Sequence, residues 1–449
     1  MSPASLKGDS PHRVELQGLS MGIGMGLTIA KKTGPKHHRG MDRGVHLTKK
    51  EEAILDGEEG GVLAKMMKLL VTLGEIGGAE RLIPIRRSQI AGVSYKTAGD
   101  PTLELIEDIA DQGVRVKTLA TLNPAGMDLK RWREMGVSEG FAEKQLRICR
   151  AYERLGAEAS CTCTPYHAGN VPSLGEVVGF SESSAVAFVN SYLGARTNRH
   201  GGLDALAAAI LGRVPLMGFL LDENRGGDLL VRVKAELKCG SDHAALGYYV
   251  GKTVRTGEVP VYDEMGDAGM GDIKLLGAAS AASGSVALFH VLGLTPEAKD
   301  EGEVFKGGRP AFKLDVTEPE IRSVYEELST ADEPDLIAVG CPHCHLKEIR
   351  NVADMLSDRK VKDGVKLWLF TSPAVFNAAE RAGYIDIIRS AGGDVFKHTC
   401  MVVAPIEEMG FRSVYTNSAK AAFYIPRMTK GQCMAALHPL RDCVRMCLK

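Results

Sequence analysis

Short apolar runs that end in glycine loops and lead into helical patterns recur along this chain of 449 residues. This rhythm limits the fold more than any other feature. Residues 336–340 (Leu-Ile-Ala-Val-Gly) have the pattern of a buried strand, and so do residues 367–371, which are followed by a helix opened by Ser372 and Pro373. Strands that alternate with helices form parallel sheets. We therefore expect an α/β fold built on parallel sheets.

The same pattern suggests how the chain is divided. Residues 1–40 combine a Gly- and Met-rich stretch with a basic one, and we expect them to be loosely ordered, with Met41 as the working start. The run Lys306–Pro310 contains two glycines and a proline and interrupts the rhythm, which is typical of a boundary. We expect one α/β region over residues 41–305 and a second over residues 306–449.

Other local patterns predict further elements. A capping box formed by Thr48 and Glu51 predicts the start of a long helix. The expected elements are a helix over 51–77, a strand over 81–85, a helix over 103–111, a strand over 114–119 and a helix within 275–294, which is rich in Ala, Gly and Ser. This last segment resembles a helix buried by close packing more than a membrane span.

Composition excludes several classes of protein. A formal net charge of −1 gives no indication of nucleic acid or of an anionic membrane as partner. Ten cysteines without a recognisable export signal indicate reduced thiols in a cytoplasmic protein rather than a disulfide framework. Such thiols either pack in the core or serve as catalytic groups or metal ligands.

Three of the cysteines lie where a parallel sheet would place a site. Cys163, Cys341 and Cys400 each follow a strand candidate, and ligands bind beyond the carboxyl ends of such strands. Three thiolates can hold an iron–sulfur cluster and leave one iron open as a Lewis acid. Two alternatives remain. Cys161 and Cys344 complete two close pairs that would suit structural zinc, and Cys341 with Cys344 also forms a redox-type Cys-x-x-Cys. The other cysteines have the pattern of packing thiols, namely Cys149, Cys239, Cys433, Cys443 and Cys447.

Polar residues at other loop positions are candidates for substrate contact. The loop Ala91–Ser94 follows a short strand, and its glycine would let backbone amides approach an anion; a plain turn is the alternative. Asn123 follows another strand candidate. Lys420 lies among small residues, where it would pair with a carboxylate or phosphate unless it is simply solvated. Glu182 lies at an expected helix start, where it either complements the helix dipole or orients a ligand.

Longer motifs resemble those of one family. They are residues 81–84 and 88–95, Cys163–Asn170, Ser181–Ala185, Gly194–Arg199, Leu221–Arg225, Gly340–His343, Thr399–Pro405 and Asn417–Lys420. Together they resemble the aconitase X family over almost everything after Met41. The resemblance implies aconitase-like multi-domain parallel α/β sheets around a central cluster site, lacking the swivelling domain. That domain is then expected as a separate small subunit, which would form a heterodimer with this chain and supply the catalytic base.

The family pattern also implies a site. It implies a cluster, [4Fe-4S] with one open iron, on Cys163, Cys341 and Cys400. The implied substrate contacts are Gly92, Val93, Ser94, Asn123, Pro124, Glu182, Ser183 and Lys420. His167 and His343, which lie beside ligand cysteines, are expected to donate hydrogen bonds to the ligand segments. Arg196 and Arg199 are expected to anchor the loops of the site.

The motifs are most similar to the archaeal branch of the family. The resemblance therefore implies a hydro-lyase that dehydrates (R)-5-phosphomevalonate to trans-anhydromevalonate 5-phosphate in the mevalonate route to isoprenoids. Dehydration of cis-3-hydroxy-L-proline, the activity of the bacterial branch, is the alternative within the family. A zinc-stabilised scaffold subunit without its own chemistry is the alternative from another class.

Overall fold

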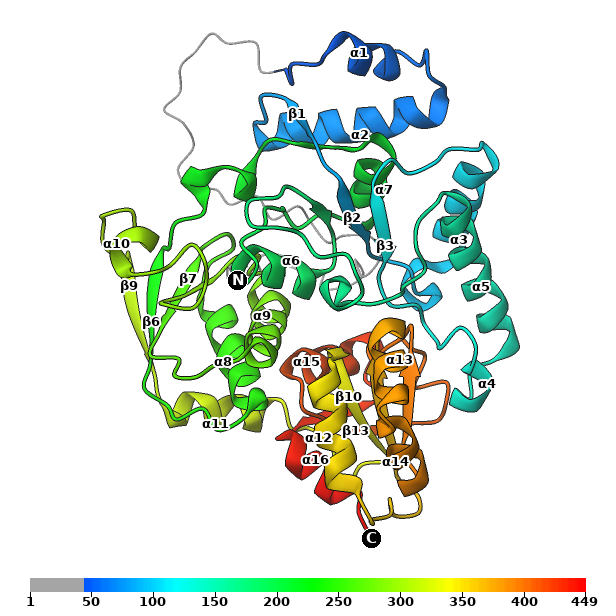
Figure 1. Cartoon of the computed structure of the whole chain (residues 1–449), viewed down its shortest axis with the longest axis vertical. Helices are drawn as coiled ribbons and strands as arrows, with labels where there is room; N and C mark the ends of the chain where they lie inside the picture. The colour runs from blue at the N-terminus through cyan, green and yellow to red at the C-terminus, as the bar shows by residue number, and fades with distance from the viewer. Residues whose placement is uncertain (1–43) are drawn as a thin grey trace, which may run out of the picture.

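The computed structural model describes residues 44–449, so the expected order of residues 1–40 and the start at Met41 lie outside the described residues. Three regions follow one another along the chain, each with a parallel sheet. Figure 1 shows residues 44–226 (the N-terminal region) at the top, residues 227–333 (the middle region) at the lower left and residues 334–449 (the C-terminal region) at the bottom.

The N-terminal region has a three-stranded parallel sheet in the order β3-β2-β4 and a separate antiparallel pair, β1-β5. Its elements are α1 (Lys49–Leu55), α2 (Gly61–Gly77), β1 (Leu82–Pro84), β2 (Arg87–Ile90), α3 (Tyr95–Asp111), β3 (Leu119–Leu122), α4 (Trp132–Met135), α5 (Glu139–Arg154), η1 (Pro165–His167), β4 (Gly179–Phe180), α6 (Ser183–Ser191), α7 (Gly202–Leu211), β5 (Arg213–Pro215), η2 (Gly218–Leu220) and η3 (Asp222–Asn224).

The middle region has four parallel strands in the order β8-β7-β6-β9. Its elements are β6 (Leu229–Val233), α8 (Gly240–Thr253), β7 (Pro260–Asp263), α9 (Met270–Gly284), β8 (His290–Val291), α10 (Glu301–Val304), β9 (Phe312–Val316) and α11 (Glu318–Glu327). Lys306–Pro310, expected to separate two regions, lies between β8 and β9 of this one sheet.

Helix α9 is the buried helix expected within 275–294; it ends at Gly284, packs most closely on helix α8 and shares one hydrophobic cluster with strand β6. A Cβ on Gly247 of α8 would lie 2.2 Å from the carbonyl oxygen of Leu276, so the two helix backbones are in direct contact. Among the helices of residues 44–449, none is long and apolar enough to cross a membrane.

The C-terminal region has five parallel strands in the order β12-β11-β10-β13-β14. Its elements are β10 (Leu336–Cys344), α12 (Leu346–Leu356), β11 (Lys366–Thr371), α13 (Pro373–Arg381), α14 (Tyr384–Ala391), β12 (Asp394–Lys397), β13 (Ser413–Thr416), α15 (Ala419–Met428), β14 (Met434–Leu437) and α16 (Leu440–Met446). The alternating strands and helices therefore form parallel sheets as predicted, and the expected α/β class is confirmed.

Two local predictions were wrong. The helix expected over 51–77 is broken between α1 and α2, because Gly57 and Gly60 adopt φ values of 91° and 105° that end one helix and start the next. The strand expected over 114–119 begins only at Leu119. The amides of Val116 and Lys117 instead donate to carbonyls at the ends of other helices, Leu155 and Ala209, so this stretch pairs with no strand.

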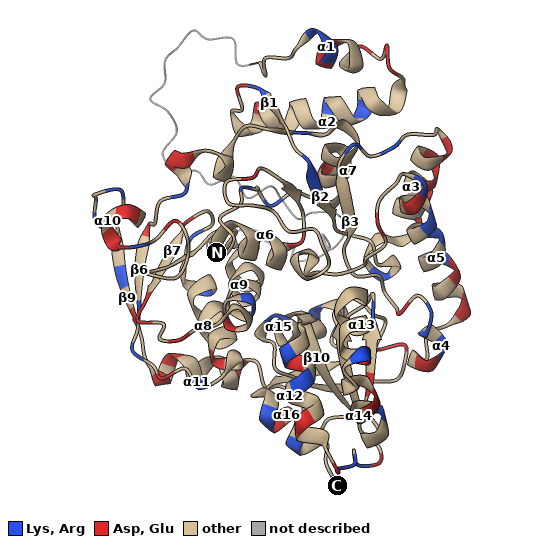
Figure 2. Cartoon of the chain, in the orientation of Figure 1, with Lys and Arg blue, Asp and Glu red and all other residues tan. Residues whose placement is uncertain are grey.

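The regions meet around helix α6. One hydrophobic cluster joins β6 and α8 of the middle region to β10, β11 and α15 of the C-terminal region. Figure 2 shows charged residues along the outer helices α3, α5, α10 and α16, whereas α6 at the centre carries none. This helix is buried along its whole length, which is why its sequence carries no charged residue and no distinct polar face.

Candidate active site

The carboxyl ends of two sheets face each other across the junction of the N-terminal and C-terminal regions. An isolated bridge joins Ala125, just after β3, to Thr399, just after β12, and the Ala125 amide donates to the His398 carbonyl at 2.7 Å. Lys96 of α3 forms an ion pair of 2.7 Å with Glu407, in the loop after Cys400. Loops that follow strands of both sheets thus lie side by side, where α/β proteins bind ligands.

The three cysteines of the prediction converge here as buried free thiols. Cys163, Cys341 and Cys400 are between 4% and 6% exposed. Burial raises the pKa of all three, that of Cys341 to about 12, and the nearby Cys341 and Cys400 further raise the pKa of Cys163. A positive ion or cluster that drew the three thiolates together would relieve this cost.

The three cysteines differ in their position relative to the strands. Cys400 follows β12, as expected. Cys341 lies within β10, past Val339, where the register with β11 shifts. Cys163 follows no strand of a sheet: its segment runs beside β3, and the Thr162 amide donates to Leu122 at 2.9 Å. The expected position at a strand end therefore holds for Cys400 alone.

The neighbouring cysteines of the two close pairs point elsewhere. The Cys161 thiol hydrogen-bonds to Cys149 in the apolar core of the N-terminal region. Cys344 lies among apolar residues on the far side of the C-terminal sheet, with Ile337 and Val339. One thiol of each close pair therefore packs in an apolar core.

This donor set suits a cluster better than a single ion. Within residues 44–449, no three His, Cys, Asp or Glu side chains are close enough to hold one metal ion. In an iron–sulfur cluster each thiolate binds a different iron, so its ligands stand farther apart than those of one zinc. Three mutually interacting, buried thiols without a compact fourth ligand fit that requirement.

A buried ion pair lies next to the thiols. Lys420, in the first turn of α15, donates to Glu182 Oε1 at 2.5 Å and to the Ser183 hydroxyl at 3.2 Å. Burial by itself would raise the pKa of Glu182, but Lys420 lowers it to about 2. Burial opposes the charge of Lys420, and Glu182 more than offsets this and raises the pKa of Lys420. Both groups are therefore charged at neutral pH.

The amide of Asn123 holds the other side of this carboxylate. Its Nδ2 donates to Glu182 Oε2 at 2.8 Å, while its Oδ1 is buried and has no partner within the described residues. Asn417 Oδ1, just before the first turn of α15, is in the same state. These two buried acceptors without partners would suit a ligand that brings hydroxyl or amine donors. Pro124 follows Asn123 and contributes no amide donor.

The loop Gly92-Val93-Ser94 connects β2 to α3. Gly92 has φ 78°, and a Cβ there would meet nothing within 4 Å. Within the part of the chain that is described, these three successive amides donate to no other residue. The Ser94 hydroxyl donates to the Val403 carbonyl at 2.8 Å, which ties this loop to the segment after Cys400. Such a run of amides at a helix start is a typical anion-binding concavity.

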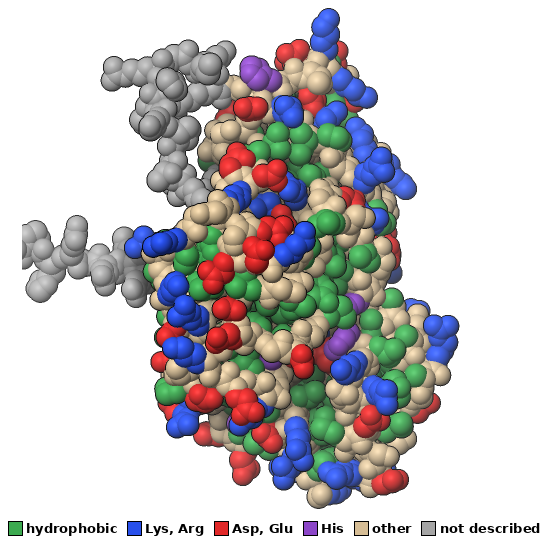
Figure 3. Space-filling view, turned by 60° about the vertical axis from the view of Figure 1, so that its left-hand side comes forward, with side chains coloured by type: hydrophobic (Ala, Val, Ile, Leu, Met, Phe, Trp, Pro, Cys, Tyr) green, Lys and Arg blue, Asp and Glu red, His purple; other side chains and the backbone are tan. Residues whose placement is uncertain are grey.

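A second buried charge pair near Cys341 was not predicted. Lys274 of α9 is 1% exposed and pairs with Glu348 Oε2 at 2.5 Å, and the His345 Nδ1 lies 2.5 Å from the same oxygen. His167 stacks on His345 with ring centroids 6.0 Å apart. Figure 3 shows histidine side chains beside the notch between the upper and lower parts of the molecule. The sequence signal was Lys274 itself, the only charge in the stretch 273–284 of a buried helix.

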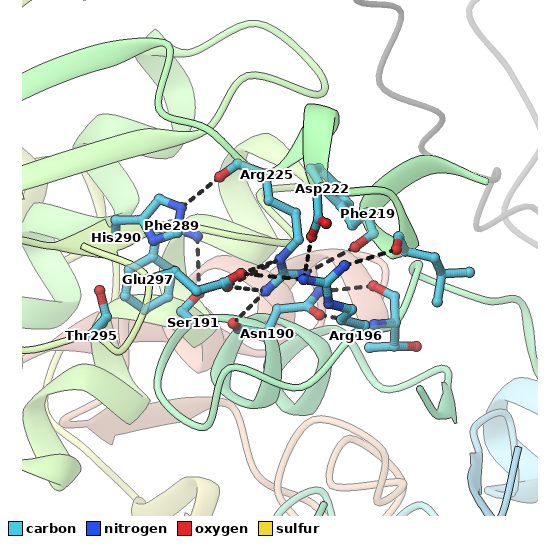
Figure 4. Close-up of polar contacts among 12 residues, drawn as sticks. Asn190, Ser191, Arg196, Phe219, Asp222, Arg225, Phe289, His290, Thr295 and Glu297 are labelled. Atoms are coloured by element: carbon cyan, nitrogen blue, oxygen red, sulfur yellow. Dashed lines mark hydrogen bonds and ion pairs between the residues drawn. The ribbon is translucent and has the colours of Figure 1, made fainter. Parts of the chain in front are cut away.

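Arg196 and Arg199, expected to anchor the site loops, and Arg225, which was not singled out, make contacts within the N-terminal region and to the middle region. Figure 4 shows Arg225 between the Asn190 carbonyl, the Phe219 carbonyl and the carboxylate of Glu297. Arg196 pairs with Asp222 and donates to Leu220 at 3.1 Å. Arg199 donates to the Ala281 carbonyl of α9 at 3.2 Å. These are structural ties that lie behind α6.

Comparison with known proteins gives one consistent result. Models of the first, second and third domains of aconitase X match residues 44–223, 227–326 and 334–449. The phosphomevalonate dehydratase large subunits of Methanocaldococcus jannaschii and Methanothermobacter thermautotrophicus are 49% and 51% identical to this chain, over 86% of it and 97% and 94% of their own lengths. The cis-3-hydroxy-L-proline dehydratase of Pseudomonas aeruginosa is 36% identical, over 87% of this chain and 68% of its own.

The fold comparison agrees with the sequence comparison. The crystal structure of Thermococcus kodakaraensis aconitase X, in its holo-form, superposes with a TM-score of 0.83 at 40% identity, and the match covers 89% of this chain and 99% of that one. The expected aconitase-like fold is thereby confirmed. The chain belongs to the aconitase X family.

Proposed function

We propose that this chain is the large subunit of a hydro-lyase that dehydrates (R)-5-phosphomevalonate to trans-anhydromevalonate 5-phosphate. The observation that carries the proposal is the meeting of three buried thiols, the Glu182–Lys420 ion pair and the free amides of the Gly92 loop at one junction. The high identity to archaeal phosphomevalonate dehydratase large subunits supports the choice of substrate.

The chain would hold an iron–sulfur cluster, [4Fe-4S], through Cys163, Cys341 and Cys400. When bound with one iron free of protein ligands, such a cluster supplies a Lewis acid for the leaving hydroxyl and for the carboxylate. Because burial raises the pKa of the thiols, cluster binding must displace their protons. Because Cys163 belongs to the N-terminal region and Cys341 and Cys400 to the C-terminal region, the cluster would also hold these two regions together.

The remaining residues bind and orient the substrate. The free amides of Gly92, Val93 and Ser94 would hold the phosphate; only one helical turn follows this loop before the kink at Gly99, so the amides rather than a helix dipole would bind the anion. Lys420 keeps its proton at neutral pH and would attract the substrate carboxylate. Glu182 holds Lys420 in place, and Asn123 Oδ1 would accept a hydrogen bond from a substrate hydroxyl.

Removal of the C2 proton needs a base on the opposite face of the substrate, and we assign none in this chain. The relatives are named large subunits, which supports a small partner subunit. We propose a heterodimer in which a small swivelling-domain subunit supplies the base. The purified large subunit alone would then show almost no turnover, and full turnover without a partner would contradict this assignment.

The test is an anaerobic assay of the two-subunit complex with two substrates. We expect loss of water from (R)-5-phosphomevalonate, followed by mass and proton NMR of the product, and no reaction of cis-3-hydroxy-L-proline. The reverse preference would move the chain to the other activity of the family. A colourless complex with one zinc and no turnover would favour the scaffold alternative.

A further inference from the structure

His343 connects the segments of all three candidate ligands. It is completely buried, two residues after Cys341. Its Nδ1 lies 2.9 Å from the Thr162 hydroxyl, next to Cys163, and its Nε2 lies 2.8 Å from the Thr399 carbonyl, next to Cys400. One imidazole ring therefore contacts the residue that precedes each of the other two cysteines.

These contacts determine how the ring is protonated. A carbonyl oxygen only accepts, so Nε2 carries the proton and donates to Thr399. In the neutral ring Nδ1 is then the acceptor, and the Thr162 hydroxyl donates to it. The same hydroxyl accepts from the Thr164 amide at 3.1 Å, so Thr162 holds the chain on both sides of Cys163. A neutral His343 donates through Nε2 and accepts through Nδ1 at the same time, which neither a lysine nor an arginine can do.

The backbone of His343 makes two further contacts. Its amide donates to the Cys163 sulfur at 3.2 Å, and its carbonyl accepts from Lys274 at 3.0 Å. Lys274 belongs to α9 of the middle region and is held by Glu348. Side chain and backbone together thus connect one residue to the N-terminal, middle and C-terminal regions.

We propose that His343 is a positioning residue that fixes the three cysteines at the spacing the cluster requires and that directs an N–H group at the sulfur of Cys163. This inference rests on the cluster of the proposed function. A hydrogen bond to a ligand sulfur tunes an iron–sulfur centre, and partners of metal ligands typically change metal affinity 10–100-fold when they are removed. His343 touches no reacting atom in this account and acts only through the cysteines.

The experiment measures the cluster rather than turnover. The full chain carrying His343→Ala, His343→Asn or His343→Gln is reconstituted anaerobically with iron and sulfide. Iron and sulfide per chain, the visible spectrum and the rate of iron release to a ferrous chelator are recorded. Asn offers an acceptor where Nδ1 lies and Gln a donor where Nε2 lies, so each restores one of the two contacts. Thr162→Val removes the Thr162 contact independently.

The chain offers a matched control. His290 is 1% exposed and its Nε2 lies 2.7 Å from the Arg225 carbonyl, but it belongs to the network of Figure 4 and contacts no cysteine segment. His290→Gln and His290→Ala remove a histidine that is equally buried and is hydrogen-bonded through Nε2, although its Nδ1 has no partner within the described residues. A general loss of stability would affect both sites, whereas a positioning role is specific to His343.

We expect His343→Ala to release iron about 10–100-fold faster than the wild type, Asn, Gln and Thr162→Val to fall between, and the His290 variants to match the wild type. If His343→Ala does not fold, the Asn, Gln and Thr162→Val variants decide. Iron release at the wild-type rate in all of these would overturn the inference and leave the proposed function intact. A wild-type chain that binds no iron would overturn both.

Discussion

The ion pair between Lys420 and Glu182 provides a quantitative test of the site. At a separation of 2.5 Å and an effective dielectric constant of about 20, the direct attraction amounts to roughly 7 kcal/mol, most of it offset by the loss of hydration. Lys420→Met removes the cation and leaves Glu182 buried with only hydrogen-bond donors. Removing one partner of a buried pair costs about 3–5 kcal/mol.

Hydrogen exchange is the suitable assay, because a chain built of three regions need not unfold in one step. The amides of Val186 and Ala422 close the first turns of α6 and α15. Their exchange in Lys420→Met should accelerate by about two to four orders of magnitude at pH 8. The effect should shrink toward pH 5, because Glu182 without its cation has a raised pKa and becomes protonated.

Two controls make this prediction sharp. The double variant Lys420→Met with Glu182→Gln leaves no buried charge and should recover most of the protection. Lys252→Met breaks a pair of similar length, 2.7 Å, whose side chains are about half exposed, and should cost at most about 1 kcal/mol. If Lys420→Met changes exchange no more than Lys252→Met does, the reasoning about burial is refuted.

Three further predictions concern the loops of the site. Gly92→Ala should raise the KM for (R)-5-phosphomevalonate about tenfold or more, because a methyl group would project into the space beside the free amides. Gly57→Ala, at a similar φ remote from the site, is the control. An unchanged KM in Gly92→Ala would show that this loop does not bind the phosphate. Gly340→Ala should lower iron content and thermal stability. The φ of 116° costs about 1–2 kcal/mol for alanine, and the added Cβ would lie 2.3 Å from the Phe370 carbonyl oxygen. An iron content equal to that of the wild type would show that the strand shifts freely. Burial would raise the pKa of Asp128, but the nearby His398 ring, whose Nδ1 lies 3.8 Å from Oδ1, and hydrogen bonds from the amides of Lys397, Lys130 and Arg131 lower it to about 2. The stabilisation of the Cys400 segment by Asp128 is therefore complete above about pH 4 and is lost as the pH falls toward 2; Asp128→Asn should flatten this acid limb in exchange at Lys397, and an unchanged limb would assign it to another group.

Much of the architecture was predictable because local patterns and tertiary packing agree. The runs that became β10 and β11 are bounded by glycine or by a capping serine, and buried parallel strands read as continuous apolar segments. The strand predicted over 114–119 was wrong for the opposite reason. The stretch alternates like a strand, but the amides of Val116 and Lys117 donate to carbonyls near helix ends. No local pattern reveals such distant partners.

Less of the site than of the fold could be predicted from the sequence. The sequence favoured Cys341 as the ligand but left Cys344 as an alternative. Residues three apart on a strand face opposite sides, and the shift of register past Val339 decides which side each thiol takes: Cys344 packs with Ile337 and Val339, away from the site. The pairing of Glu182 with Lys420 joins residues more than two hundred positions apart, so neither residue alone indicated it. Lys274 stood out as a lone charge in an apolar helix, but its partner Glu348 came from another region.

The most direct test of the account is anaerobic iron and sulfide analysis of the reconstituted two-subunit complex with single cysteine variants. The account predicts several irons per chain in the wild type and in Cys344→Ala, and a loss of the cluster in Cys163→Ala, Cys341→Ala and Cys400→Ala. Loss of the cluster in Cys344→Ala with retention in Cys341→Ala would contradict the proposed ligand set, and one zinc per chain without sulfide would contradict the cluster itself.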